Sequence, residues 1–306
     1  MTSASQLRPV EPEEHTQALH LWQTVFGETP GYFERYYEAD PEYRLGDTLG
    51  AWDGDELVSA VHLCRRRVAW KGGSLLCGGI ANVATRPSFR RRGLSSQLLQ
   101  QMIVKMEAEG FDFSLLGTGT HAHYAALGWE AVERPQATLV PAAAPPQESD
   151  WAAFVSPSLT CALYPRSPRP LQFERSLAYF EGWVGWDWRK PETTLLTWPG
   201  LGYAVLAGDG GEAATLKEWR AVDQAAERTL LQAASAEAWR RGRTRLWVEA
   251  LPQHGGYGLL ESLGAVEPES EGGGMIRRIH LSPVDFEEVR TAYATGTAAW
   301  WPADGF

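Results

Sequence analysis

A strand-like segment that turns abruptly into an amphipathic helix is the feature that most restricts the fold of this chain. Leu75–Thr85 has the apolar and small residues of a strand, whereas apolar residues recur at helical spacing after Gly93. The pair Glu109-Gly110 suits a helix C-terminus, and Phe113–Leu116 predicts another strand. The periodic apolar positions of the helix are Leu94, Leu98, Leu99, Met102, Ile103 and Met106.

The residues before this segment predict a strand at Leu7–Val10, a helix whose apolar face includes Leu21 and Phe26, and a short helical stretch at Tyr32–Tyr37. An antiparallel meander should follow, because turn-forming residues separate short strand-like runs. These runs are Leu49–Trp52, Leu57–Leu63 and Leu75–Thr85.

At 306 residues the chain is longer than one ordinary domain, so two domains are expected. Proline and alanine dominate residues 141–150 and weaken any periodic signal there. We therefore predict a first domain at 1–140, a linker at 141–150, a second domain at 151–285 and a C-terminal tail at 286–306.

The two halves resemble each other. The first has helix Leu98–Glu109 and strand Phe113–Leu116, and the second has helix Leu230–Arg241 and strand Arg245–Val248. The pairs Leu127-Gly128 and Leu263-Gly264 close the two stretches. Chance recurrence of short elements is the competing interpretation, and the internal repeat is the one we favour.

The turn Arg90-Arg91-Arg92-Gly93-Leu94-Ser95 lies where the strand gives way to the helix. Main-chain N–H groups at a helix N-terminus have no intrahelical acceptors, and the helix dipole there favours negative charge. Gly93 allows close approach of the backbone, so the turn can cradle a pyrophosphate. A solvated basic turn is the alternative, since Arg65-Arg66-Arg67 shows another such run.

The formal net charge of −10 disfavours nucleic-acid binding, which needs a basic face, and mildly favours cationic substrates. Cys64, Cys77 and Cys161 are odd in number and form no C-x-x-C pair, so neither disulfides nor zinc is indicated. The N-terminus has no signal-peptide pattern, and no run is apolar enough for a membrane span. We expect a cytoplasmic protein without membrane or nucleic-acid partners.

The run from Val83 to Ser95 resembles the cofactor motif of the GCN5-related N-acetyltransferase (GNAT) family, Gln/Arg-x-x-Gly-x-Gly/Ala at a strand-to-helix junction. It supplies Arg90 and Gly93, and Ser95 replaces the usual glycine or alanine. The resemblance covers roughly residues 6–140. It implies an α/β fold with a mixed sheet and acetyl-CoA as cosubstrate, bound by main-chain groups of the strand and by the loop amides.

Twelve residues are assigned to the cofactor by this resemblance. They are Val83, Ala84, Thr85, Arg90, Arg91, Arg92, Gly93, Leu94, Ser95, Ser96, Gly119 and Thr120. No metal is expected, because the pair His121-x-His123 lacks a carboxylate or thiolate at ligand spacing.

A second family signature, Tyr-x-x-x-Gly-Phe, is matched by Tyr124-Ala125-Ala126-Leu127-Gly128-Trp129, with tryptophan in the last place. The resemblance assigns to Tyr124 the protonation of the departing CoA thiolate. An aromatic residue that only packs beneath a helix is the alternative.

The tandem arrangement resembles the enhanced-intracellular-survival (Eis-like) acetyltransferases, but without their sterol-carrier-like third domain. In that group a degenerate second domain follows the catalytic one, and a C-terminal carboxylate acts as the base. The resemblance makes the carboxylate of Phe306 the base candidate; His121, His123, Glu28 and water stay open.

The second half lacks the cofactor machinery. Gln224–Glu227 stands where the loop would be, without glycine or a basic run, and Leu260 replaces the tyrosine. We expect one active site per chain and a second domain that shapes the acceptor pocket. For Trp183, Trp186 and Trp188 we favour packing between domains over a cation-binding aromatic wall.

The expected activity is therefore acetyl transfer from CoA to a primary amine of a small, cationic acceptor, with Tyr124 as the general acid. A non-catalytic acyl-CoA sensor is the alternative. The sequence leaves open the identity of the amine, the preferred acyl chain and whether the chain forms a homo-oligomer.

Overall fold

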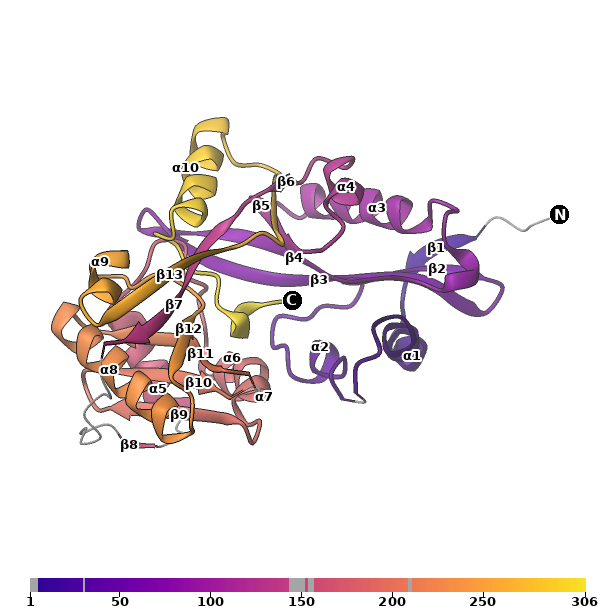
Figure 1. The fold of residues 1–306 in the computed structure, drawn as a ribbon. Helices are drawn as coiled ribbons and strands as arrows, with labels where there is room; N and C mark the ends of the chain where they lie inside the picture. The colour runs from indigo at the N-terminus through magenta and orange to yellow at the C-terminus, as the bar shows by residue number, and fades with distance from the viewer. Residues whose placement is uncertain (1–4, 30, 143–151, 154–156, 209–210) are drawn as a thin grey trace. The chain divides into compact units, whose positions relative to one another are not determined.

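The computed structural model describes residues 5–29, 31–142, 152–153, 157–208 and 211–306. These residues form two compact units, and each is built on a mixed β-sheet with helices (Figure 1). The first unit comprises Met1–Val132, Gly273–Arg290 and Phe306, and the second comprises Glu133–Gly272 and Thr291–Gly305. This architecture confirms the predicted α/β class with mixed sheets.

The sheet of the first unit has the strand order β1-β2-β3-β4-β5-β14-β6. Neighbouring strands are antiparallel except β4 and β5, which are parallel and are connected through helix α3. The predicted meander is confirmed as β2, β3 and β4. The strands are β1 (Gln6–Pro9), β2 (Thr48–Asp53), β3 (Glu56–Trp70), β4 (Gly73–Thr85), β5 (Phe113–Gly117), β6 (Glu130–Ala131) and β14 (Gly274–Arg278).

Helices cover both faces of this sheet (Figure 1). The helices α1 (His15–Phe26) and α2 (Arg35–Glu38) lie on one face, and α3 (Leu94–Ala108) and α4 (His121–Ala125) lie on the other. Strand β3 is therefore buried along most of its length rather than on alternate residues.

Helix α3 forms because its predicted apolar face meets the sheet and a glycine bounds each of its ends. All six predicted apolar positions are buried. Gly93 precedes the helix with φ +76°, and Gly110 follows it with φ +74°, a left-handed conformation that glycine adopts at little cost. The Phe111 N–H donates to the Met106 carbonyl and closes the last turn.

The second unit repeats the arrangement of a parallel pair of strands around a crossover helix, β11-α8-β12. Its strand order is β13-β7-β12-β11-β10-β9-β8, and its other neighbours are antiparallel. The strands are β7 (Arg134–Pro141), β8 (Ala152–Ala153), β9 (Thr193–Trp198), β10 (Gly202–Ala207), β11 (Ala213–Ala221), β12 (Arg245–Val248) and β13 (Gly264–Glu271).

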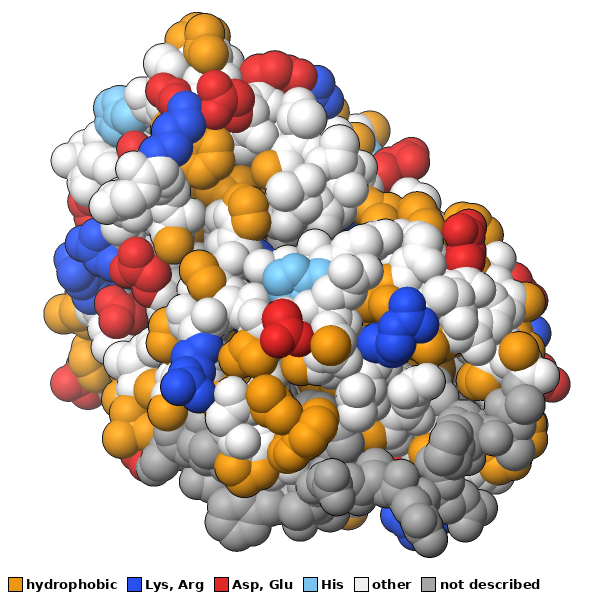
Figure 2. Space-filling model, turned by 90° about the vertical axis from the view of Figure 1, so that its left-hand side faces the viewer, with side chains coloured by type: hydrophobic (Ala, Val, Ile, Leu, Met, Phe, Trp, Pro, Cys, Tyr) orange, Lys and Arg blue, Asp and Glu red, His pale blue; other side chains and the backbone are white. Residues whose placement is uncertain are grey.

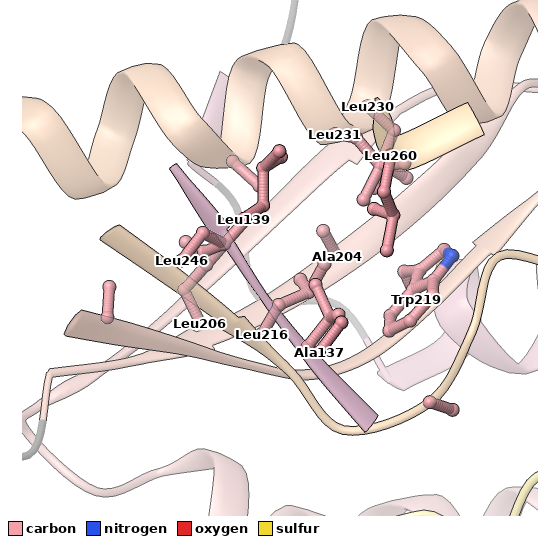
Figure 3. Packing of buried hydrophobic residues seen from close by; sticks show 14 of the residues in the cluster. Ala137, Leu139, Ala204, Leu206, Leu216, Trp219, Leu230, Leu231, Leu246 and Leu260 are labelled. Carbon is pink, nitrogen blue, oxygen red and sulfur yellow. The ribbon is translucent and has the colours of Figure 1, made fainter. Parts of the chain in front are cut away.

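The core of the second unit lies between α8 and its sheet. Leu230 and Leu231 of α8 project toward the sheet, with Leu206 and Leu246 among the strand residues beneath them (Figure 3). Trp183 and Trp188 are also buried within this unit, where Trp188 packs against Phe180 and Tyr203. The remaining helices are α5 (Pro157–Leu163), α6 (Leu177–Tyr179), α7 (Gly185–Trp188), α8 (Gln224–Arg240), α9 (Gly256–Glu261) and α10 (Pro283–Ala294).

The two sheets exchange strands, which differs from the expected boundaries 1–140 and 151–285. Strand β7 follows the first unit in sequence but pairs with β12 and β13 of the second sheet. Strand β14 follows the second unit but pairs with β5 and β6 of the first. Of the expected linker at 141–150, residues 143–150 lie outside the described part of the chain.

Among the described residues, no helix has the length and apolar character needed to cross a membrane. On the face shown in Figure 2, basic and acidic side chains are interspersed with apolar ones. The described residues on that face therefore form no continuous basic stripe.

Candidate active site

Strand β4 carries a bulge at Asn82 and Val83. Ala60 of β3 pairs with Ala84 and His62 pairs with Ala81, so the two residues between them on β4 oppose one residue on β3. Asn82 has φ +51°, which is unusual for a residue other than glycine. A bulge bends its strand and redirects the following residues.

The parallel pairing between β4 and β5 ends just before this bulge. It joins Cys77–Gly79 to Phe113–Leu115. A cavity of about 430 Å³ lies beyond it. Its described lining is Phe26, Glu28, Tyr32, Phe33, Tyr36, Ile80, Ala81, Asn82, Val83, Gly117, Thr118, Gly119, Thr120, Tyr124 and Phe306.

This cavity brings together five of the predicted site residues: Val83, Gly119, Thr120, Tyr124 and Phe306. The other predicted cofactor residues are not in its lining. They continue along the chain from β4 into the start of α3.

The loop between β4 and α3 has the backbone of an anion cradle. Arg91 (φ +63°) and Gly93 (φ +76°) both adopt left-handed conformations immediately before the helix. The first N–H groups of α3 have no acceptor within the helix. A Cβ on Gly93 would meet nothing closer than 3.6 Å, so the constraint on this residue is its backbone conformation rather than space.

The three loop arginines are exposed. Arg90 Nε donates to the Thr85 carbonyl at 3.2 Å, and Arg92 donates to the Ser88 carbonyl at 3.0 Å. Arg92 also lies over the ring of Phe89, at 4.5 Å from its centroid. These contacts shape the loop while leaving positive charge at the helix N-terminus.

Leu94 is buried in the core beneath α3, so its side chain packs and only its main chain is suited to bind a ligand. The hydroxyl of Ser59, on β3, donates to the Ala84 carbonyl at 2.8 Å and lies 2.7 Å from the Thr85 hydroxyl. Ser59 therefore supports the end of β4. This role of Ser59 could not be predicted from the sequence, because a local pattern does not reveal the register between strands.

Tyr124 lies on α4, almost fully buried at 8% exposure, and its ring packs edge-on against Trp129. Burial raises the pKa of its phenol, and a hydrogen bond with the Thr118 side chain acts in the opposite direction. The phenol therefore keeps its proton at neutral pH, as a general acid requires.

The base candidates separate by position. Phe306 and Glu28 are in the cavity lining, whereas His121 and His123 are not. The His123 ring instead packs edge-on against Tyr124, with centroids 5.1 Å apart. Within the described part of the chain, no group of three or more His, Cys, Asp or Glu residues could hold a metal ion.

The corresponding junction of the second unit is built differently. Asp223 caps α8 by accepting a 2.8 Å hydrogen bond from the Ala226 N–H. In the first turn, the buried Glu227 accepts hydrogen bonds from the Gln253 and His254 N–H groups. A capped and acidic helix start does not favour an anion, and Leu260 is buried in the core.

Comparison with known proteins supports the interpretation that the first unit, and not the second, holds the candidate active site. Residues 6–132 match the family model described as an acetyltransferase (GNAT) domain. They include β4, the loop, α3 and Tyr124.

Solved structures share the fold over most of the chain. A probable N-acyltransferase from Enterococcus faecalis V583 has a TM-score of 0.73 at 16% identity, covering 90% of this chain and 73% of that one. Eis1 from Mycobacterium abscessus has a TM-score of 0.68 at 16% identity, with 90% and 74% covered. Saccharomyces cerevisiae N-myristoyltransferase with bound myristoyl-CoA has a TM-score of 0.60 at 10% identity, with 98% and 90% covered.

The two mixed sheets agree with the tandem GNAT-type fold that the sequence predicted. Residues 6–132, which lie within the first unit, therefore match a GNAT acetyltransferase domain.

Proposed function

We propose that this chain transfers an acetyl group from acetyl-CoA to a primary amine of a small acceptor. The observation that carries the proposal is that Tyr124, a protonated buried phenol, lines the same cavity as the bulged segment of β4. Both β4 and the proposed general acid Tyr124 thus line the cavity in which we propose that the thioester binds.

The residues fit the parts of acetyl-CoA that they would bind. Beyond Gly79 the pairing with β5 stops, which leaves main-chain groups of Val83 to Thr85 for the pantetheine arm. The N–H groups from Arg91 to Ser96 suit the pyrophosphate, because two left-handed residues and a helix start direct them to one place.

Tyr124 supplies the proton in the proposed reaction. The neutral amine nitrogen forms a bond to the acetyl carbonyl carbon, the carbon–sulfur bond breaks, and the phenol O–H protonates the departing sulfur. The proton that the nitrogen loses as the amide forms restores the phenol. Thr118 orients the phenol through their hydrogen bond.

An alkylammonium has a pKa of about 10.4, so the acceptor must lose a proton before it attacks. For a chain whose last residue is Phe306, the proposed base is the carboxylate of that residue. Its place in the cavity lining supports this choice over His121 and His123. Glu28, in the same lining, is the second candidate, directly or through water.

The further features of the Eis-like group enter here as proposals. The capped, acidic start of α8 supports a second domain that binds no cofactor. One active site per chain follows from this.

A non-catalytic acyl-CoA sensor would use the same loop without turnover. Calorimetric titration with acetyl-CoA and amine-dependent release of CoA thiol separate the two functions. The enzyme requires both signals, whereas binding without thiol release across a broad amine panel would identify a sensor.

A further inference from the structure

One part of the cavity wall is aromatic. Phe26 ends α1, Tyr32 and Phe33 precede α2, and Tyr36 lies within α2; all four line the cavity. The rings of Phe26 and Phe33 lie 5.8 Å apart and those of Tyr32 and Phe33 lie 4.9 Å apart, centroid to centroid. These spacings are typical of packed aromatic pairs.

The outermost ring of this wall is exposed. Phe33 and Tyr36 are buried, whereas Phe26 is 47% exposed although it lies against Phe33 and the cavity. An exposed aromatic ring at the mouth of a small cavity gives an apolar ligand group surface to cover.

The charges around this wall nearly balance. Glu28 is the one acidic side chain among the described residues of the lining, and in a chain that ends at Phe306 this residue adds the carboxylate proposed as base. Behind the wall, the Arg35 guanidinium lies 4.8 Å from the Tyr32 ring centroid and 5.1 Å from that of Tyr36. It also donates to both tyrosine hydroxyls. The two carboxylates and the Arg35 guanidinium together give one net negative charge, which suits a ligand with a single ammonium group.

We propose that the acceptor is an arylalkyl monoamine, an aromatic ring joined to one primary amine by a short alkyl chain. The inference rests on the proposed function and names its substrate class. The ring packs against the exposed ring of Phe26, and the amine reaches the thioester beside Tyr124. The described lining has no carboxylate-rich surface that would select a polycation.

The size of the cavity agrees with this class. About 430 Å³ lies within the usual range of roughly 300–1,000 Å³ for small-molecule sites. A single ring with a two-carbon chain fits beside the acetyl end of the cosubstrate, whereas a large multi-ring acceptor would have to remain mostly outside these residues.

The test compares kcat/KM for 2-phenylethylamine, n-propylamine and spermidine at saturating acetyl-CoA. We expect 2-phenylethylamine to exceed both others by about tenfold, because a buried aromatic contact is worth about that factor. Phe26→Ala should lower kcat/KM several-fold more for 2-phenylethylamine than for n-propylamine. Its side chain is exposed, so the variant should fold.

Leu45→Ala is the matched control, because Leu45 is a 59% exposed apolar residue of the same unit outside the cavity lining. It should leave all three values unchanged. Preference for spermidine, equal use of n-propylamine, or equal losses in Phe26→Ala would overturn the arylalkyl assignment while leaving acetyl transfer intact. Absence of amine-dependent thiol release with every amine, despite acetyl-CoA binding, would overturn the transferase function as well.

Discussion

The ring of Phe306 lies directly on Gly79 of β4, so closely that a Cβ at position 79 would come within 2.5 Å of ring atom Cδ1. Real Cβ atoms do not approach other atoms to that distance. Gly79 is also the last residue of β4 paired with β5 before the strand enters the cavity. Because Gly79 has no side chain, the ring of Phe306 can occupy the space beside β4.

Gly79→Ala should therefore displace Phe306 and lower kcat while sparing acetyl-CoA affinity. Misplacement of a catalytic group by about 1 Å can cost on the order of 100-fold in rate. Steady-state kinetics together with calorimetric binding measure both quantities. Gly73→Ala is the control, since a Cβ there meets only the Trp70 carbonyl, at 3.6 Å.

Removal of Phe306 itself tests the same group without adding a side chain. A positioned base typically contributes about 10²–10⁴-fold, so truncation should lower turnover by at least about 100-fold. Full activity in the truncated chain would reject Phe306 as the base and would direct attention to Glu28.

Gly93→Ala should weaken acetyl-CoA binding by about tenfold. Its φ of +76° costs an alanine roughly 1–2 kcal/mol, and the strain is relieved by reshaping the loop before α3. Gly54→Ala is a matched control: Gly54 has φ +62° in the turn between β2 and β3, with nothing within 4 Å of a new Cβ. Equal affinity losses in both variants would mean that stability, rather than the cradle, was affected.

His62 should make the first unit sensitive to acid. It is fully buried among aromatic rings, and burial together with the nearby Arg66 lowers its pKa to about 3. The unfolded chain binds a proton near pH 6.5 whereas the folded chain does not. The stability from this group is therefore present above pH 6.5 and is lost as the pH falls toward 3.

Denaturant unfolding at pH 7 and pH 5 measures this effect. The free energy of unfolding should fall between pH 7 and pH 5, and in the His62→Phe variant this fall should be smaller by about 2 kcal/mol. Thr48 keeps its 3.0 Å contact with the Tyr37 hydroxyl in that variant. An unchanged fall would show that His62 does not govern the acid response, and His20→Asn, which replaces an exposed histidine, controls for loss of an imidazole.

Local patterns in the sequence predicted the elements that depend on local physics. The meander followed from alternating runs and turns, and α3 from six apolar residues with glycines at both ends. The change from strand to helix pattern also predicted a loop ending at Gly93, and such a loop joins β4 to α3. Tyr124, which the resemblance to a family signature singled out, lines the cavity.

Long-range pairing was not predictable in the same way. A short strand such as β14 has the same local pattern whichever sheet it joins, so the exchange of β7 and β14 between the sheets left no local signal. The bulge at Asn82 depends on register against β3. Phe26 lies on an apolar helical face that predicted burial equally well, although its ring is exposed beside the cavity.

The central claim is that Tyr124 protonates the departing CoA thiolate. Its most direct test is to measure, for the Tyr124→Phe variant, both kcat for acetyl-CoA-dependent amine acetylation and the Kd for acetyl-CoA. The phenol is the proposed proton donor to sulfur, so its removal should lower kcat by about 10²–10⁴-fold. The Kd should change little, because Phe keeps the ring against Trp129. Wild-type turnover in Tyr124→Phe, or acetyl-CoA binding without N-acetylated product in the wild-type protein, would contradict the account.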